Sequence, residues 1–310
     1  MSNVLEKICV TMAAGELLVG VLVNGFIGIV NFMDCIKTRK ISYLNFILTG
    51  LAISRIGLLG ILALQVFSLS FYQFYLKINW RDFNTLWILT NTSSSWFSAF
   101  LIVFYFLKIA NFSHPIFLWL KWRVNRGVLR MLFGCYFLSF FVCLLLSLIN
   151  NALHVPFYLE NNITLTQKIQ VPKTSIFYSV ILLSFGGLIP LAMSLISCFL
   201  LVLSLWRHTW QMQLHITGSK DASMEAHIKA MKSMISFFFL FVLYYACILS
   251  LVKNDAEMKR KPLLLLILIT MIKYPLVHSI ILILGHSKLK PIAMRVLWKL
   301  RVCFKCSGKG

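Results

Sequence analysis

The sequence predicts an all-α membrane protein: a bundle of seven membrane-spanning helices with a short amphipathic helix after the seventh. Hydrophobic residues make up 59% of the 310 residues and charged residues only 13%, against about 45–50% and 25% in soluble domains. Seven apolar stretches fill most of the chain, and a helix needs about 20 such residues to cross the hydrocarbon core. The expected helices are Met12–Phe32, Asn45–Leu69, Leu86–Ala110, Val128–Ile149, Ile176–Leu205, Ile235–Leu251 and Leu263–Leu284.

These stretches favour helices over the strands of a membrane barrel. Barrel strands alternate apolar and polar residues, whereas Phe237–Phe241 and Leu263–Leu268 are unbroken apolar runs. A helix also satisfies every backbone polar group within its own segment, as lipid requires. The stretches leave little chain for anything else, so we expect one domain spanning residues 1–310. No inverted repeat of the kind found in many transporters is visible.

The first helix is expected to stay in the protein rather than to be cleaved as a signal peptide. The residues before it include Glu6 and lack a basic start, and its apolar stretch runs into the basic segment Lys37–Lys40. The short segment Lys37–Ser42 then predicts a tight return into the second helix. The longest outer loop is expected at Asn151–Thr174, where Asn162-Ile163-Thr164 predicts glycosylation of Asn162.

The basic residues predict how the bundle is oriented. Most of the 30 Lys and Arg residues fall on one side of the membrane, in the first, second and third inner loops and the tail 285–310. The positive-inside rule therefore predicts an extracellular N-terminus and a cytoplasmic tail. We expect this multi-pass protein to lie in the plasma membrane. The formal charge of +21 thus indicates membrane orientation rather than nucleic-acid binding.

After the seventh helix, Ile292–Cys306 predicts a short helix on the inner leaflet. Its apolar residues alternate with Arg295, Lys299 and Arg301, so that a basic side can face anionic lipid headgroups. Cys303 and Cys306 follow this pattern and are candidates for reversible acylation. The six other cysteines are scattered, and we interpret most of them as small buried apolar residues.

Polar residues within the apolar stretches need partners or functions. One interpretation is a structural network joining the first, second and seventh helices, centred on Asn24 and Arg55, with the guanidinium satisfied by helix carbonyls and an Asn oxygen. Another is a charge pair between Glu16 and Lys273. The sequence leaves both open. Other polar or helix-bending residues of the seventh helix assigned to this network are Pro275, His278 and Ser279.

Trp87 and Asn91 lie four residues apart on the third helix and therefore share one face near its outer end. An aromatic ring beside an amide suits a small amphipathic ligand. Interface anchoring by Trp87 with ordinary helix packing explains the pattern equally well. Catalysis has no support: there is no Ser-His-Asp set, no HExxH and no phosphate loop, and the seven histidines do not cluster for a metal. We expect no enzyme activity, cofactor or metal.

Several segments, taken together, are far more specific for one family than any of them alone. The segments are Leu51–Arg55, Phe104–Ser113, His114–Lys121, Pro190–His208, Glu225–Lys232, Tyr274–Leu284 and Lys288–Lys290. With these segments the chain resembles, nearly end to end, the type 2 taste receptors, the bitter receptor branch of the G-protein-coupled receptors.

Absent motifs agree with this resemblance. Rhodopsin-like receptors end the third helix with an acidic-Arg-Tyr triplet, where this chain has Phe104–Phe106, and their NPxxY motif is replaced by Pro275 with His278 and Ser279. Their outer disulfide is excluded because Asn151–Thr174 contains no cysteine. Vomeronasal type-1 receptors are the alternative chemosensory family, and a transporter that uses Glu16, Arg55 and Lys273 as a relay is a third reading.

The resemblance implies a receptor that binds small bitter molecules in the outer half of the bundle and activates a heterotrimeric G protein of the gustducin type. By motif position, the implied ligand-binding residues are Trp87, Asn91, Tyr244, Leu268 and Met271. Tyr244 also matches a sixth-helix aromatic that moves on activation. The implied G-protein-coupling residues are Tyr105, Lys108, His208, His227, Lys229 and Lys232.

One departure bears on the ligand. Many members of the family place a polar or acidic group where Leu268 stands, so an apolar residue predicts a preference for less cationic ligands. The sequence does not identify the agonist, and it leaves open whether the protein is a monomer or a homo- or hetero-oligomer.

Overall fold

The computed structural model describes residues 2–39, 42–70, 80–110, 118, 129–160, 184–214, 235–236, 238–250 and 261–307. Its helices are α1 (Ser2–Thr38), α2 (Tyr43–Ser70), α4 (Trp80–Ile109), α6 (Leu129–Glu160), α8 (Ile189–Leu214), α10 (Lys261–Gly285) and α11 (Leu289–Ser307). A π-helical turn, η2 (Ser184–Leu188), precedes α8. A further apolar helix, Phe238–Ser250, is called the sixth helix below.

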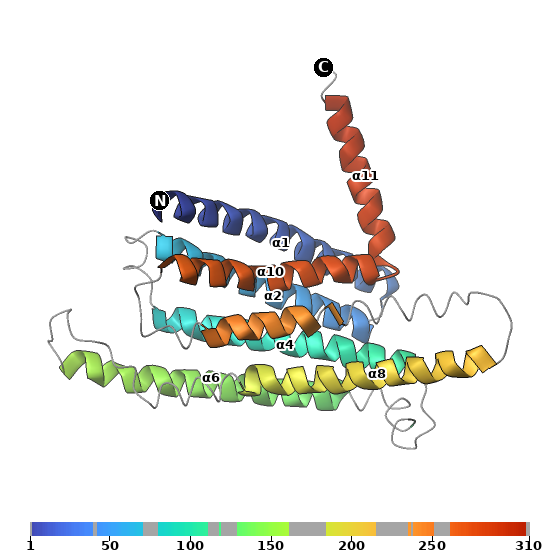
Figure 1. Cartoon of the computed structure of the whole chain (residues 1–310), viewed down its shortest axis with the longest axis horizontal. Coiled ribbons are helices and arrows are strands. Elements are labelled where there is room, and N and C mark those ends of the chain that lie inside the picture. Colours follow the sequence, from blue (N-terminus) through green and yellow to red (C-terminus); the bar gives the residue numbers. More distant parts are fainter. Residues whose placement is uncertain are drawn as a thin grey trace.

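The long helices lie side by side as a bundle (Figure 1). Helix α2 packs against α1, α4 and α10, and α4 packs against α6 and α8, so α2 and α4 form the centre. Helix α11 leaves the end of α10 at a steep angle (Figure 1). This arrangement brings helices that are far apart in sequence, α1 and α10, into contact.

The described helices are apolar enough for a membrane. Five of them contain a span of sufficient length: Lys7–Thr38, Tyr43–Ser70, Thr85–Lys108, Gly186–Ser204 and Leu263–Gly285. Two shorter apolar helices, Phe133–Leu145 and Phe238–Ser250, lie within the fourth and sixth predicted stretches. Each of the seven predicted stretches thus contains an apolar helix, and α11 covers the predicted amphipathic helix.

Helix ends differ from the expected bounds because apolar stretches mark lipid rather than backbone conformation. Helix α1 begins at Ser2, well before the expected Met12. Helix α6 continues to Glu160, so the expectation that Asn151–Thr174 is wholly loop is wrong for its first ten residues. A helix can extend past the hydrocarbon into water, where polar residues are tolerated.

Two local features set where helices turn. Arg39 has a φ of 50°, the left-handed conformation that commonly ends a helix, directly after α1. Pro190 is the second residue of α8 and has no N–H to donate to the carbonyl of Gly186. The π-helical turn η2 lies directly before it, as expected where a regular helix cannot continue without a clash.

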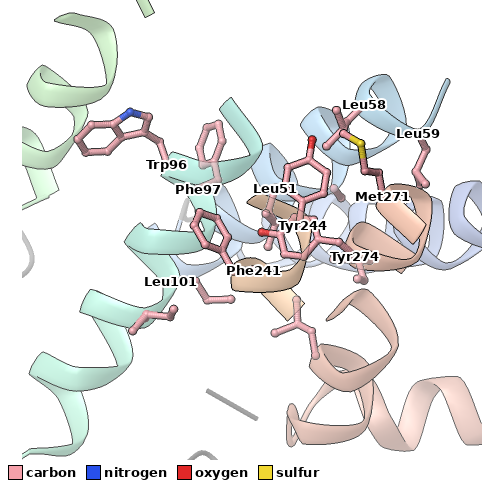
Figure 2. Packing of buried hydrophobic residues seen from close by; sticks show 14 of the residues in the cluster. Leu51, Leu58, Leu59, Trp96, Phe97, Leu101, Phe241, Tyr244, Met271 and Tyr274 are labelled. Carbon is pink, nitrogen blue, oxygen red and sulfur yellow. The ribbon is translucent and has the colours of Figure 1, made fainter. Parts of the chain in front are cut away.

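The core lies where α2, α4, the sixth helix and α10 meet. Figure 2 shows side chains that these helices bring into the core, among them Leu51 and Leu58 of α2, Phe241 and Tyr244 of the sixth helix and Tyr274 of α10. All five are buried. The outward faces instead expose large apolar side chains, which suits lipid contact; examples are Leu22 and Ile29 on α1, Phe137 and Phe141 on α6, and Phe199 on α8.

Candidate functional site

The predicted ligand residues of the third and sixth helices contact each other. The hydroxyl of Tyr244 donates a hydrogen bond to Oδ1 of Asn91 at 2.8 Å. Both side chains are buried, Asn91 on α4 and Tyr244 on the sixth helix. Trp87 lies one turn from Asn91, and its indole Nε1 is buried without a hydrogen-bond partner among the described residues. The arrangement therefore leaves one indole donor unused beside a bonded amide.

Aromatic rings continue this cluster inwards and join the sixth helix to α10. Tyr244 stacks on Tyr274 with ring centroids 4.8 Å apart, and Phe241 meets Tyr274 edge to face at 5.8 Å. The neighbouring Tyr245 hydroxyl is 3.3 Å from Oγ of Ser95 on α4. Ring stacking and these hydrogen bonds fix the sixth helix against α4 and α10.

Leu268 and Met271, the predicted ligand residues of the seventh helix, are both buried on α10. Figure 2 places Met271 towards α2, near Leu58. None of the five predicted ligand residues carries a charge, so the contacts that they offer are apolar groups, aromatic rings and hydrogen bonds.

The structure brings together Arg55, Ser279, His278 and Asn24 of the predicted polar network. Nη1 of Arg55 donates to Oγ of Ser279 at 2.7 Å, and Nη2 contacts Nδ1 of His278. Oγ of Ser279 is also 2.8 Å from Oδ1 of Asn24 and 2.8 Å from the carbonyl oxygen of Pro275. Because Ser279 has one hydroxyl proton, it donates to one of these acceptors at a time.

The partners of Arg55 differ from those expected. Helix carbonyls and an Asn oxygen were predicted, but the guanidinium bonds to hydroxyls and an imidazole, and Asn24 is reached only through Ser279. Sequence reasoning missed Ser98 of α4, whose Oγ is 3.3 Å from Nη2. Its small size and its place among the hydroxyl residues of the third helix were the available signal.

Glu16 and Lys273 lie near enough to attract each other electrostatically. Oε2 of Glu16 is nevertheless buried without a hydrogen-bond partner among the described residues. Lys273 is exposed and shares the outward face of α10 with Leu266, Ile280 and Leu284. The structure thus points Lys273 away from the core, and the charge pair stays a prediction.

The inner end of α4 carries two of the predicted coupling residues. Tyr105 is half-buried and Lys108 is exposed, with its Nζ 6.0 Å from the centre of the Phe104 ring. Cys303 is exposed on α11. Asn162, His227, Lys229 and Lys232 lie outside the described residues, as do the side chains of His208 and Cys306.

A polar clasp at the inner end escaped sequence reasoning. Asp34 at the end of α1 accepts from Nδ2 of Asn45 on α2 at 2.7 Å. The same carboxylate oxygen lies 2.5 Å from Nζ of Lys288, directly before α11. The clasp therefore joins three parts of the chain. Its signal in the sequence was an acidic residue among basic ones, at Asp34 before Lys37.

His286 caps the start of α11. Its Nδ1 accepts from the backbone N–H of Lys288 at 3.2 Å and of Leu289 at 3.4 Å, which serves donors that a helix start leaves unpaired. Burial, together with the nearby charges of Lys288 and Lys108, lowers the pKa of His286. The neutral ring, which alone can accept at Nδ1, is therefore favoured.

No group of three His, Cys, Asp or Glu side chains that could hold a metal occurs within the described ranges. Within the same ranges, the arrangement offers no nucleophile with an adjacent base. It offers instead a buried, uncharged aromatic and amide cluster linked through stacked rings to a polar network between helices.

Comparison with known proteins accords with this geometry. Residues 1–301 match the family described as "Taste receptor protein (TAS2R)". "Taste receptor type 2 member 10" of Papio hamadryas is 43% identical over 312 residues, covering 98% of this chain and 97% of that protein. "Taste receptor type 2 member 7" of the same species is 40% identical over 301 residues, covering 96% and 95%.

The fold has a counterpart among solved structures. The crystal structure of squid rhodopsin superposes with a TM-score of 0.66 at 14% identity, over 97% of this chain and 88% of that one. At this identity the likeness concerns the fold alone. It confirms the predicted all-α membrane bundle, and the match to the family confirms the resemblance that the sequence motifs indicated.

Proposed function

Because the chain belongs to the type 2 taste receptor family, we propose that it binds small bitter molecules in the outer half of its bundle and activates a heterotrimeric G protein of the gustducin type. Membership makes it a multi-pass membrane receptor rather than an enzyme. We propose further that it acts at the plasma membrane with its N-terminus outside.

One contact carries the proposal: the hydrogen bond from Tyr244 to Asn91. It crosses from the sixth helix to α4 at the residues that family resemblance assigns to ligand binding. A ligand that bonds to Asn91 competes with the Tyr244 hydroxyl and so alters the tie between these helices. The unpartnered Nε1 of Trp87 supplies a donor for a ligand acceptor beside them.

Ligand chemistry follows from the residues that line this region. Trp87, Asn91, Tyr244, Leu268 and Met271 offer rings, apolar groups and hydrogen bonds but no carboxylate. A permanent cation would lose its hydration there without gaining a counter-charge, which is costly. We therefore propose neutral or weakly basic amphipathic molecules as preferred agonists.

Coupling to the inner side follows from a population shift. A ligand can favour the active arrangement only by its difference in affinity for the two states, typically about 1–3 kcal/mol. The stacked pair Tyr244 and Tyr274 ties the sixth helix to α10, so a change at Tyr244 is transmitted along both. Tyr105 and Lys108, with His208, His227, Lys229 and Lys232, are the residues that we propose meet the G protein.

Calcium release tests this function in cells that express the chain with a gustducin-like chimeric G protein, across a panel of bitter compounds. We expect responses to neutral agonists that are lost in Trp87→Ala and Asn91→Ala at equal surface staining. Leu86→Ala is the matched control, because Leu86 adjoins Trp87 but is 53% exposed on the outward face.

Two results would contradict the proposal. Full responses in both pocket variants would place the ligand elsewhere, and strong activation by quaternary ammonium compounds that survives every pocket substitution would remove the proposed ligand preference. Surface staining separates both from a receptor that fails to reach the membrane.

A further inference from the structure

Arg55 buries a positive charge at the centre of the bundle, and no described residue gives it a negative partner. Arg55 is 0% exposed, and its guanidinium contacts Ser279, Ser98, His278 and Tyr274. The hydroxyls are uncharged, and His278 is neutral where its Nδ1 accepts from Arg55. Buried charges in proteins are ordinarily paired, because an isolated one is expensive to remove from water.

The acidic residues of α1 lie too far along the helix to neutralise Arg55. Ser279 contacts both Arg55 and Asn24, so Asn24 is the residue of α1 that lies at the same depth in the bundle as Arg55. Glu16 lies about 12 Å from that level along the axis and Asp34 about 15 Å in the other direction, at about 1.5 Å per residue. Asp34 is moreover engaged by Asn45 and Lys288. Among the described residues no carboxylate hydrogen-bonds to the guanidinium.

One donor of the guanidinium is also unused. Nε of Arg55 is buried and has no hydrogen-bond partner among the described residues. A buried N–H of a charged group that lacks an acceptor is costly. A water molecule would satisfy this donor but not the charge, whereas a small anion would satisfy both.

We propose that the centre of the bundle binds a small monovalent anion of the halide class at the Nε edge of Arg55, beside the hydroxyl of Ser98. One negative charge balances the one buried positive charge. Arg55 is fully buried, and Leu51 and Leu58, which share its face of α2, are buried and apolar; this setting favours a compact anion over a phosphate or a carboxylate. The site lies between α2, α4 and α10, so its occupant stabilises their packing.

Thermal unfolding of the purified receptor in lipid nanodiscs tests the proposal. Chloride or bromide replaces gluconate at constant ionic strength. Because a ligand that binds the folded state raises its stability with concentration, we expect a saturable rise of several degrees in melting temperature. Arg55→Gln should lose this rise. Arg301→Gln, which removes an exposed arginine from α11, should keep it.

Radiolabelled chloride binding to the unmodified receptor decides the matter even where Arg55→Gln does not fold. We expect saturable binding of a single chloride per receptor. Absence of saturable binding, or equal melting temperatures in chloride and gluconate, would overturn the proposal and leave water as the acceptor. A halide effect that persists unchanged in Arg55→Gln would overturn it too, because the anion would then bind elsewhere.

Discussion

At the scale of single residues, buried donors and acceptors decide which side chains meet. Tyr244 and Asn91 were both assigned to ligand binding from the sequence, but their mutual hydrogen bond was not foreseen. The same holds for Arg55, whose hydroxyl partners come from α4 and α10. A sequence shows which buried residues need partners, whereas the choice among several nearby hydroxyls depends on helix rotation.

The cap formed by His286 predicts a pH dependence at the start of α11. The folded-state pKa of His286 is lowered from the ordinary value near 6.5, so its stabilising effect is present above about pH 6.5. It is lost as the pH falls through the lower folded-state value, because a protonated Nδ1 cannot accept. We expect hydrogen exchange at Lys288 and Leu289 to speed up in acid.

His286→Asn supplies the matched control for this titration. Asparagine offers an acceptor that does not titrate, so exchange at these amides should stay slow in acid beyond the ordinary chemical dependence on pH. His286→Ala removes the cap, at a cost of about 0.5–2 kcal/mol, and should exchange fast at every pH. If the pH profiles of amide exchange were identical in the wild type and in His286→Asn, the imidazole would not be the titrating cap of α11.

At the scale of elements, the apolar stretches predicted every described membrane helix, but not its ends. Hydropathy reports where lipid lies, and α1 and α6 continue as helices beyond that region. The π-helical turn before Pro190 was also missed. Its signal was present, as two glycines closely followed by a proline, yet the same pattern fits an ordinary helix start.

Close packing at this turn makes Gly187 sensitive to substitution. A Cβ at this position would overlap the hydroxyl and ring of Tyr245 on the sixth helix. We expect Gly187→Ala to lower the melting temperature by several degrees, since overpacking costs roughly 1–3 kcal/mol. Differential scanning fluorimetry of the purified receptor measures the shift.

Gly25→Ala is the corresponding control on α1. A Cβ there meets no atom within 4 Å, and alanine favours a helix over glycine by up to about 1 kcal/mol. Its melting temperature should match or exceed that of the wild type. If the melting temperature of Gly25→Ala fell as far as that of Gly187→Ala, the loss of stability would come from replacing any helical glycine rather than from contact with Tyr245.

At the scale of the whole molecule, the clasp of Asp34, Asn45 and Lys288 fixes α11 to the bundle. The side chains of Lys288 and Asp34 are 43% and 23% exposed, and such pairs contribute about 0.2–1 kcal/mol. Breaking the pair should therefore change the position of α11 rather than unfold the receptor. We expect Asp34→Lys and Lys288→Asp each to broaden the distribution of positions that α11 adopts. The double exchange, which restores the charge pair, should narrow this distribution again.

Electron paramagnetic resonance distances between labels at the exposed positions Ile36 and Leu297 measure this spread. Lys290→Asp, which reverses an exposed charge on α11 itself, should leave the distribution unchanged. A double exchange no narrower than either single variant would rule out a direct pair. The sequence marks Asp34 as an unusual acidic residue but does not reveal its partner, because Lys288 lies more than 250 positions away and only the bundle brings the two together.

The early start of α1 has a practical consequence for detecting this receptor on cells. A helix rises about 1.5 Å per residue, so Ser2 stands about 15 Å beyond Met12 along the axis. With the N-terminus outside, as we propose, a peptide epitope fused ahead of Ser2 would be carried away from the lipid surface, where an antibody can reach it. A fluorophore attached there would report the tilt of the bundle, because α1 continues from Ser2 into the bundle as one unbroken helix.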